Sequence, residues 1–218
     1  MNASVFDHSS VFYNHEFENI LIGIINCYKL IITCKVVLPN DENEIRNKIV
    51  GDDYLNNNQV RKKLGIIDYI FEPEAPEKTG RVDIKIISRQ STFIDTKAYY
   101  IIECKRLDNK NTTGTTGLNA KYINDGIARF ASEKYSMYGN TAGMIGFVVE
   151  EMDIHQNILD IRTLLNQHFF AHVSTEEAFA HKTIVTDFKF SYYSIHKIDG
   201  VSKIIYHLMF DFSNNIAV

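Results

Sequence analysis

The sequence predicts an α/β fold in which a mixed β-sheet is flanked by helices. Three observations predict it. The elements follow the order helix, three strands, helix, strand over about residues 41–150. The second helix connects two strand-like segments, and such a crossover makes the two strands parallel. With 218 residues, of which 45% are hydrophobic and 23% charged, the chain is expected to bury one core as a single domain, residues 1–218.

Composition also limits the class of protein. The formal net charge of −4 argues against a protein that coats nucleic acid by bulk electrostatics, but it allows an enzyme with a local basic groove. The three cysteines, Cys27, Cys34 and Cys104, form an odd set without metal-ligand spacing, which favours a reducing compartment. The polar first fifteen residues do not resemble a signal peptide. We therefore expect a cytoplasmic protein without a membrane partner.

The N-terminal 40 residues are expected to extend the core. The apolar stretch Ile20 to Leu38 is interrupted by Asn26, Lys29 and Lys35, so it predicts two buried strands, or a strand and a helix, rather than a membrane span.

The first helix and strand of the core come next. Residues 41–55 are expected to be helical, because Ile45 and Ile49 lie one turn apart and Asp41 is placed to cap the start. Residues 66–72 then predict a strand, which Pro73 and Pro76 are expected to end.

The next two strands carry the polar residues of interest. Residues 81–88 alternate, with Asp83 on the polar face, and residues 98–105 are rich in aromatic and branched side chains. After a polar loop over 108–119, residues 120–135 have helical periodicity. Residues 142–149 form a nearly uninterrupted apolar run, typical of a strand buried on both faces.

The C-terminal third, residues 151–218, is expected to extend the core or build a partner interface. It predicts a helix over 154–170 and strands near 187–197 and 202–212, with Gly200 in a hairpin turn. His168 and His172 lie one helical turn apart, but no third ligand accompanies them, which favours a surface or interface pair over a zinc site.

A constellation for phosphodiester chemistry lies at the end of the third strand. Residues two apart in a strand share a face, so Glu103 and Lys105 point the same way and Cys104 points into the apolar layer. Magnesium prefers oxygen ligands and keeps several waters, so Asp83, Glu103 and the backbone carbonyl of Cys104 are the candidate ligands. Lys105 would orient the attacking water or neutralise charge that develops on the phosphate.

These residues carry a resemblance to a known family. Gly80-Arg81-Val82-Asp83-Ile84, followed by Ile101-Ile102-Glu103-Cys104-Lys105-Arg106, resembles the motif of the PD-(D/E)xK nuclease superfamily, with Val82 in place of the proline. The similarity covers about residues 41–150 and includes the order of elements, so it implies a restriction endonuclease-like core (αβββαβ). It also implies cleavage of DNA with Mg²⁺, for which Mn²⁺ can substitute, as in a restriction-type or phage-defence endonuclease.

The resemblance further implies an acidic residue on the first helix. Glu42 is preferred over Glu44, because it lies three residues before Ile45 and therefore beside the inward face, whereas Glu44 fits a capping box with Asp41. Glu72 is a weaker candidate.

Polar or basic groups of the second helix are expected to face the phosphates. Lys121, Tyr122 and Arg129, with Arg106 of the strand, are the candidates for nucleic-acid binding, and Tyr122 is equally compatible with the core. The cluster Arg61, Lys62 and Lys63 is interpreted as a solvated face.

Two other functions remain open. One is a Holliday-junction or repair nuclease that recognises branched structure. The other is a non-catalytic nuclease-fold subunit that binds DNA or a partner protein. A homodimer is expected if both strands are cut symmetrically, with the C-terminal hairpin as one place for its interface.

Overall fold

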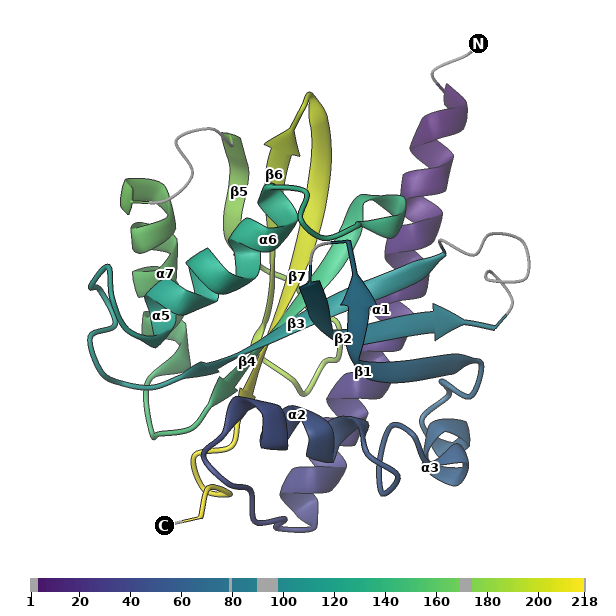
Figure 1. Ribbon diagram of the computed structural model, residues 1–218, viewed down its shortest axis with the longest axis vertical. Coiled ribbons are helices and arrows are strands. Elements are labelled where there is room, and N and C mark those ends of the chain that lie inside the picture. Colours follow the sequence, from purple (N-terminus) through teal and green to yellow (C-terminus); the bar gives the residue numbers. More distant parts are fainter. Residues whose placement is uncertain (1–3, 79, 90–97, 169–173, 218) are drawn as a thin grey trace.

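Seven strands form one mixed sheet in the computed structural model, which describes residues 4–78, 80–89, 98–168 and 174–217 (Figure 1). The order across the sheet is β1-β2-β3-β4-β7-β6-β5. The pairs β3–β4 and β4–β7 are parallel and the other pairs are antiparallel. The strands are β1 (Tyr69–Glu77), β2 (Gly80–Ser88), β3 (Tyr99–Leu107), β4 (Thr141–Val148), β5 (Ser174–His181), β6 (Ser191–Ile198) and β7 (Val201–Asp211).

Helices cover both faces of this sheet. They are α1 (Ser4–Thr33), α2 (Glu42–Val50), α3 (Asn58–Lys63), α5 (Leu118–Tyr122), the π-helical turn η1 (Ile123–Ile127), α6 (Ala128–Ala131), the 3₁₀ turn η2 (Tyr138–Asn140) and α7 (Ile154–His168). In the part of the chain that the structure describes, no helix is both long and apolar enough to cross a membrane.

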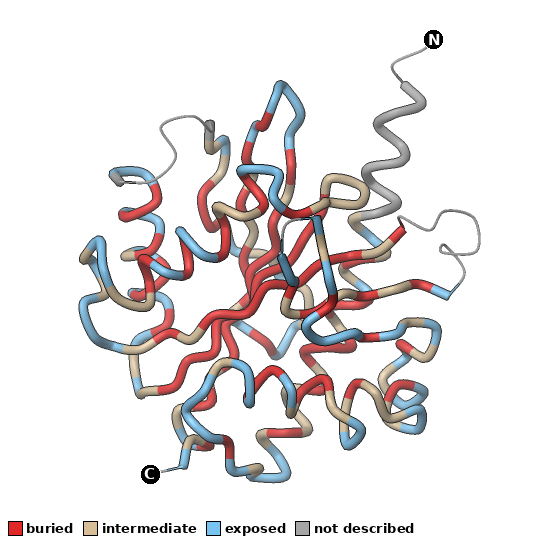
Figure 2. The backbone as a smooth tube through the Cα atoms, viewed as in Figure 1, coloured by how far each residue is buried: buried red, intermediate tan, exposed pale blue. Residues whose placement is uncertain are grey.

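The core has two layers, one on each face of the sheet. One layer packs α1 and α2 against the sheet, and the other packs α5, η1, α6 and α7. Successive residues of β3 enter different layers, with Ile101 in the second layer and Ile102 in the first. The central strands are therefore buried on both sides (Figure 2).

The order of elements expected from the sequence is confirmed. α2, β1, β2, β3, the helical segment α5–η1–α6 and β4 follow one another, and β3 and β4 are parallel. Asp41 caps α2 by accepting hydrogen bonds from the backbone N–H groups of Asn43 and Glu44. The C-terminal hairpin is β6–β7, in which Ile198 pairs with Val201 around Gly200.

Several expectations at the chain's outer elements are wrong. The stretch Ile20 to Leu38 does not form strands, since its helical part belongs to α1, whose inward face carries Phe17, Ile20 and Ile24 at helical spacing. Pro73 and Pro76 lie inside β1 and do not end it. Both are tolerated because β1 is an edge strand, which has a ladder on one side.

Other boundaries also differ. The first core helix ends at Val50, because Gly51 leaves the helical conformation. The second helix is interrupted by the π-helical turn η1, and β5 is a strand that the sequence did not predict. Arg61 is buried, whereas its neighbours Lys62 and Lys63 are exposed as expected.

The β1–β2 hairpin bends across one face of the sheet. Its pairing with β3 ends at Ile84 opposite Ile102, whereas β1 and β2 stay paired as far as Glu77 and Gly80. Glu74 has a φ of 53°, and beyond it Ala75 and Val82 pack into the second core layer. The bend leaves one edge of β3 open next to the end of the hairpin (Figure 1).

Candidate active site

Carboxylates cap the open edge of β3. Past Ile102, β3 remains paired with β4 as far as Leu107, but β2 has turned away. The backbone N–H groups on the open edge need other acceptors. The N–H of Cys104 donates to Asp83 Oδ2 at 2.7 Å, and the N–H of Arg106 donates to Glu42 Oε2 at 2.9 Å. The strand edge therefore fixes two acidic side chains beside each other.

The Lys105 ammonium lies at the centre of four oxygen atoms. It is 3.0 Å from Glu42 Oε1 and 3.0 Å from Glu103 Oε1. It donates to the backbone carbonyl of Cys104 at 2.7 Å and lies 3.7 Å from Asp83 Oδ2. Three elements, α2, β2 and β3, thus direct oxygen atoms toward one point.

Two arginines flank this group. Arg46 Nη1 donates to Asp83 Oδ1 at 2.9 Å and also pairs with Glu74. On the other side, Arg129 Nη1 donates to Glu103 Oε1 at 2.8 Å. Arg46 and Glu74 were not predicted as site residues. The signal for Arg46 was its position four residues after Glu42, on the same face of the helix.

Burial and charge shift the ionisation of the central pair. Burial, with the nearby Asp83 carboxylate, raises the pKa of Glu103 to about 7, although Lys105 and Arg129 act in the opposite direction. Burial alone would lower the pKa of Lys105, but the surrounding carboxylates outweigh it and raise that pKa. Lys105 is therefore a cation at neutral pH, held among acidic groups.

The donor set fits a hard divalent cation. Carboxylate and carbonyl oxygens are the ligands that Mg²⁺ prefers, and Glu103 Oε2 is buried without a hydrogen-bond partner among the described residues. In the described part of the chain, no group of three or more His, Cys, Asp and Glu side chains stands in metal-holding geometry. The Lys105 ammonium occupies the point at which the oxygen atoms of Glu42, Glu103 and Cys104 converge.

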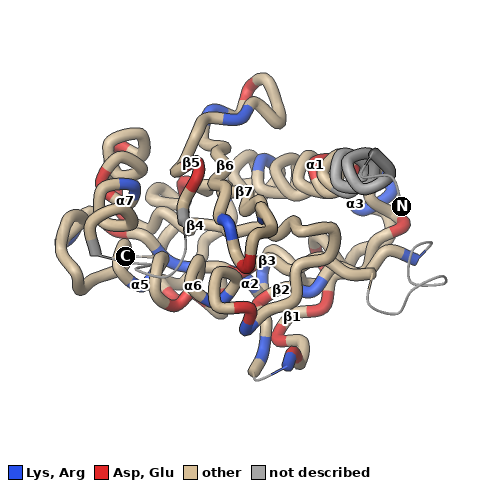
Figure 3. The backbone as a smooth tube through the Cα atoms, turned by 90° about the horizontal axis from the view of Figure 1, so that it is seen from above, with Lys and Arg blue, Asp and Glu red and all other residues tan. Residues whose placement is uncertain are grey.

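The site opens to solvent through two adjoining pockets. One, of about 320 Å³, is lined by Asp83 and Glu103. The other, of about 400 Å³, is lined by Arg106 and Lys121. Glu42, Lys105 and Arg129 line both. Both acidic and basic residues lie near α2, β2, β3 and α6 (Figure 3), and both kinds line the two pockets.

The other candidate site residues differ in whether they reach the two pockets. Arg106 and Lys121 lie at the second pocket. Glu44 and Glu72 are exposed, and neither contacts the group of Glu42, Asp83, Glu103, Lys105 and Arg129, here called the Lys105 cluster. The expectation that Tyr122 contacts nucleic acid is wrong, and the alternative that it belongs to the core is correct. It is fully buried and its hydroxyl is hydrogen-bonded with His207, so it is a core residue and does not reach the pocket.

The histidine pair lies beyond what the structure describes. His172 falls outside the described residues, as does the side chain of His168.

Comparison with known proteins does not assign a function to this site. No family model, curated protein or solved structure matches the chain.

Proposed function

We propose that the chain is a metal-dependent nuclease that hydrolyses DNA phosphodiester bonds and belongs to the PD-(D/E)xK superfamily. One observation carries the proposal. Oxygen atoms of Glu42, Asp83 and Glu103 converge with the Cys104 carbonyl at the open edge of β3, next to a buried lysine. Burial of these charges costs desolvation free energy, and neither the strand nor the core needs them in order to form.

The architecture supports the same reading. The succession α2, β1–β3, α5–α6 and β4 corresponds to the αβββαβ order of the restriction endonuclease-like core. The antiparallel β1–β2–β3 meander and the parallel β3–β4 pair also agree with that order. α1 and the segment from α7 to β7 then stand as additions to this core.

The residues would hold one divalent cation. Asp83, Glu103 and the Cys104 carbonyl would be its ligands, and Glu42 would be a fourth ligand or would hold a water molecule of the cation. When bound, Mg²⁺ would supply Lewis-acid activation of the scissile phosphate and of the attacking water.

Lys105 has the central role in this chain's own chemistry. Its ammonium lies inside the oxygen set, and its four-carbon stem lets it move toward a phosphate when a cation enters. There it neutralises the charge that develops on the phosphate oxygens. Arg129 steadies Glu103 from the other side, and Arg106 and Lys121 offer positive charge to flanking phosphates.

Cleavage assays test the proposal. Supercoiled plasmid, linear duplex and a four-way junction are incubated with the protein in Mg²⁺, in Mn²⁺ or in chelator. The wild type is expected to cut at least one DNA in either metal and none in chelator. Asp83→Asn, which keeps the shape of the side chain, is expected to lose cleavage and to bind Mg²⁺ more weakly by calorimetry. The matched control is Lys62→Gln, an exposed cation on α3.

The outcomes separate the classes of function. If the folded wild type leaves every DNA intact in both metals, the enzymatic proposal is wrong and the non-catalytic subunit is favoured. Cleavage of the junction alone would favour a structure-specific nuclease. Unchanged Mg²⁺ affinity in Asp83→Asn would contradict the assignment of the ligands.

A further inference from the structure

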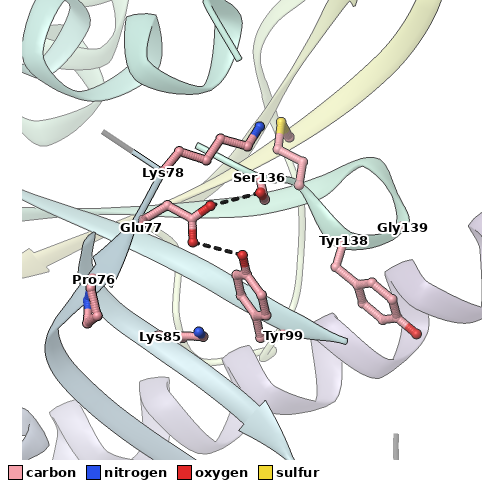
Figure 4. Close-up of a pocket in the computed structure, with 9 residues that line it drawn as sticks. Pro76, Glu77, Lys78, Lys85, Tyr99, Ser136, Tyr138 and Gly139 are labelled. Carbon is pink, nitrogen blue, oxygen red and sulfur yellow. Dashed lines mark hydrogen bonds between the residues drawn. The ribbon is translucent and has the colours of Figure 1, made fainter. Parts of the chain in front are cut away.

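A further pocket lies beside the end of the bent β1–β2 hairpin. Its volume is about 770 Å³, within the range of small-molecule sites. The hairpin end, the start of β3 and the turn before β4 build it (Figure 4). None of the residues that line it belongs to the proposed metal site. It is therefore a separate recess.

The end of the hairpin is fixed over this recess by three hydrogen bonds. The Tyr135 hydroxyl donates to the Arg81 carbonyl at 2.7 Å, and the Ser136 hydroxyl donates to Glu77 Oε1 at 2.8 Å. Lys78 Nζ donates to the Glu133 carbonyl at 3.2 Å. The wall of the pocket is thus held in place, which lowers the cost of ordering it around a ligand.

Glu77 is the polar centre of the pocket. Its Oε2 accepts a hydrogen bond from the Tyr99 hydroxyl at 2.8 Å, while its Oε1 accepts the one from Ser136 (Figure 4). Two hydroxyl donors therefore fix the carboxylate. Each carboxylate oxygen can accept more than one hydrogen bond. The two oxygens of Glu77 can therefore accept two further, parallel hydrogen bonds from N–H groups of a ligand.

Cations and aromatic rings complete the lining. Lys85 Nζ lies 4.0 Å from the centre of the Tyr99 ring, and Lys78 lies at the opposite wall. Tyr99 and Tyr138 add aromatic surface to the lining; Lys85 covers one face of the Tyr99 ring, and Tyr138 packs edge to face with Tyr100. The combination is one fixed carboxylate, two ammonium groups and two aromatic side chains.

We propose that this pocket binds a guanine nucleotide. Among the common bases, guanine alone presents two adjacent N–H donors, at N1 and N2, which match a carboxylate. It also carries acceptors at O6 and N7 that suit an ammonium group. Adenine, cytosine and uracil offer one donor position beside an acceptor. The phosphate would be met by the other of the two ammonium groups, Lys78 or Lys85, and a tyrosine ring would stack on the base. Lys78 has N–H donors left beside its bond to the Glu133 carbonyl.

Two sources share this chemistry, a free guanine nucleotide and an unpaired guanine within a strand. The proposal does not rest on the nuclease assignment, because it concerns different residues and its test uses neither metal nor cleavage. Failure of one therefore leaves the other standing.

Calorimetry in chelator tests it, with guanosine, inosine and adenosine monophosphates and inorganic phosphate as probes. The guanosine nucleotide is expected to bind about tenfold more tightly than the inosine nucleotide, which lacks the 2-amino group. Glu77→Gln is expected to remove that preference. Lys85→Gln leaves the bonds of Glu77 in place and is expected to weaken both nucleotides alike. Lys62→Gln is the matched control.

The second arm uses fluorescence anisotropy of a thymine oligonucleotide that carries one central guanine or hypoxanthine. A guanine preference in this arm assigns the pocket to a nucleic-acid strand, and a preference for the free nucleotide alone assigns it to an effector. Equal binding of all nucleotides and phosphate, or no binding in either arm by a folded wild type, would overturn the proposal. So would a preference that persists in Glu77→Gln.

Discussion

Two buried polar clusters occupy opposite halves of the sheet, and they differ in charge. The Lys105 cluster at β2 and β3 is ionic. The other is a chain of neutral groups on β5, β6, β7 and α5, in which Ser194 is hydrogen-bonded with His196 Nε2 at 2.9 Å and with His207 Nε2 at 2.8 Å. His207 Nδ1 is in turn hydrogen-bonded with the Tyr122 hydroxyl at 2.9 Å, and His196 Nδ1 with Thr175 at 3.2 Å.

The difference in charge indicates that the neutral network stabilises the fold, whereas the Lys105 cluster is suited to chemistry. Burial lowers the pKa of His196 to about 4, and burial, with the neighbouring His196, holds the pKa of His207 well below its ordinary value. Both rings are therefore neutral, and each nitrogen has a partner. The Lys105 cluster instead keeps charges, opens to solvent, and leaves Glu103 Oε2 without a described partner. A satisfied neutral network stabilises a fold, whereas unsatisfied charge beside a pocket is typical of a functional site.

Removal of the central cation should give the largest effect. Lys105→Ala is expected to lower DNA cleavage by about 100- to 1,000-fold, the loss typical of one electrostatic contact to the transition state. In chelator the variant should melt at a lower temperature, because Glu42, Asp83 and Glu103 are left to repel one another. Mg²⁺ should raise that melting temperature more than it raises the wild type's. Equal Mg²⁺ shifts in a thermal melt would contradict a cation site at this point.

Acid should break the neutral network instead. His196 binds a proton less readily in the folded chain than in the unfolded chain, where its pKa is near 6.5. The contribution of neutral His196 to the free energy of unfolding is therefore fully present above about pH 6.5. It is lost as the pH falls toward 4, and the loss is about 3 kcal/mol. Urea titrations across this range check it, with His196→Gln as the comparison. An equally steep loss in the variant would assign the effect to other groups.

Loss of the shared hydroxyl should cost somewhat less. Ser194→Ala removes one hydrogen bond from each of two buried histidine rings, and we expect the free energy of unfolding to fall by about 2 kcal/mol. Cleavage per folded molecule should not change. Ser202→Ala, at an exposed serine of β7, serves as the matched control. A drop in specific activity for Ser194→Ala would show that the two clusters are coupled.

The smallest effect should distinguish the two helix glutamates. Glu42→Gln keeps the shape but weakens the contacts to Lys105 and to the Arg106 N–H, so cleavage is expected to fall about tenfold. Glu44→Gln should cleave like the wild type, because Glu44 is exposed. The ratio of kcat/KM for the two variants measures this, and equal losses would remove Glu42 from the site.

Much of the central sheet could be predicted from local pattern. β2 alternates and β4 is continuously apolar, and these patterns record burial on one face or on both. The pairing of Glu103 with Lys105 followed from strand geometry alone. The resemblance implied an acidic residue on the first helix, and helix geometry favoured Glu42 over Glu44. In the structure the Glu42 carboxylate accepts a hydrogen bond from Lys105.

The peripheral elements depended on long-range packing. The isoleucines of α1 favour strands by local propensity, but the sheet selects the helix because it buries one helical face. β5 lacks a regular pattern, since its pairing with β6 shifts register and Phe179 has a φ of 55°. Glu74 could not be placed, because the hairpin bend that brings it to Arg46 has no local signal. For Arg46 the sequence offered only its spacing from Glu42, and its contact with Asp83 depends on the packing of α2 against the sheet.

The two ends of the sheet limit how this protein can assemble. β1 carries Pro73, Pro76 and an interrupted backbone at Glu74, while β5 is bulged around Phe179. Neither border offers a regular row of free backbone donors and acceptors, so a second copy has no template for continuing the sheet. We therefore expect a dimer of this chain to form through helices or side-chain faces. For the same reason we expect little strand-by-strand polymerisation at high concentration.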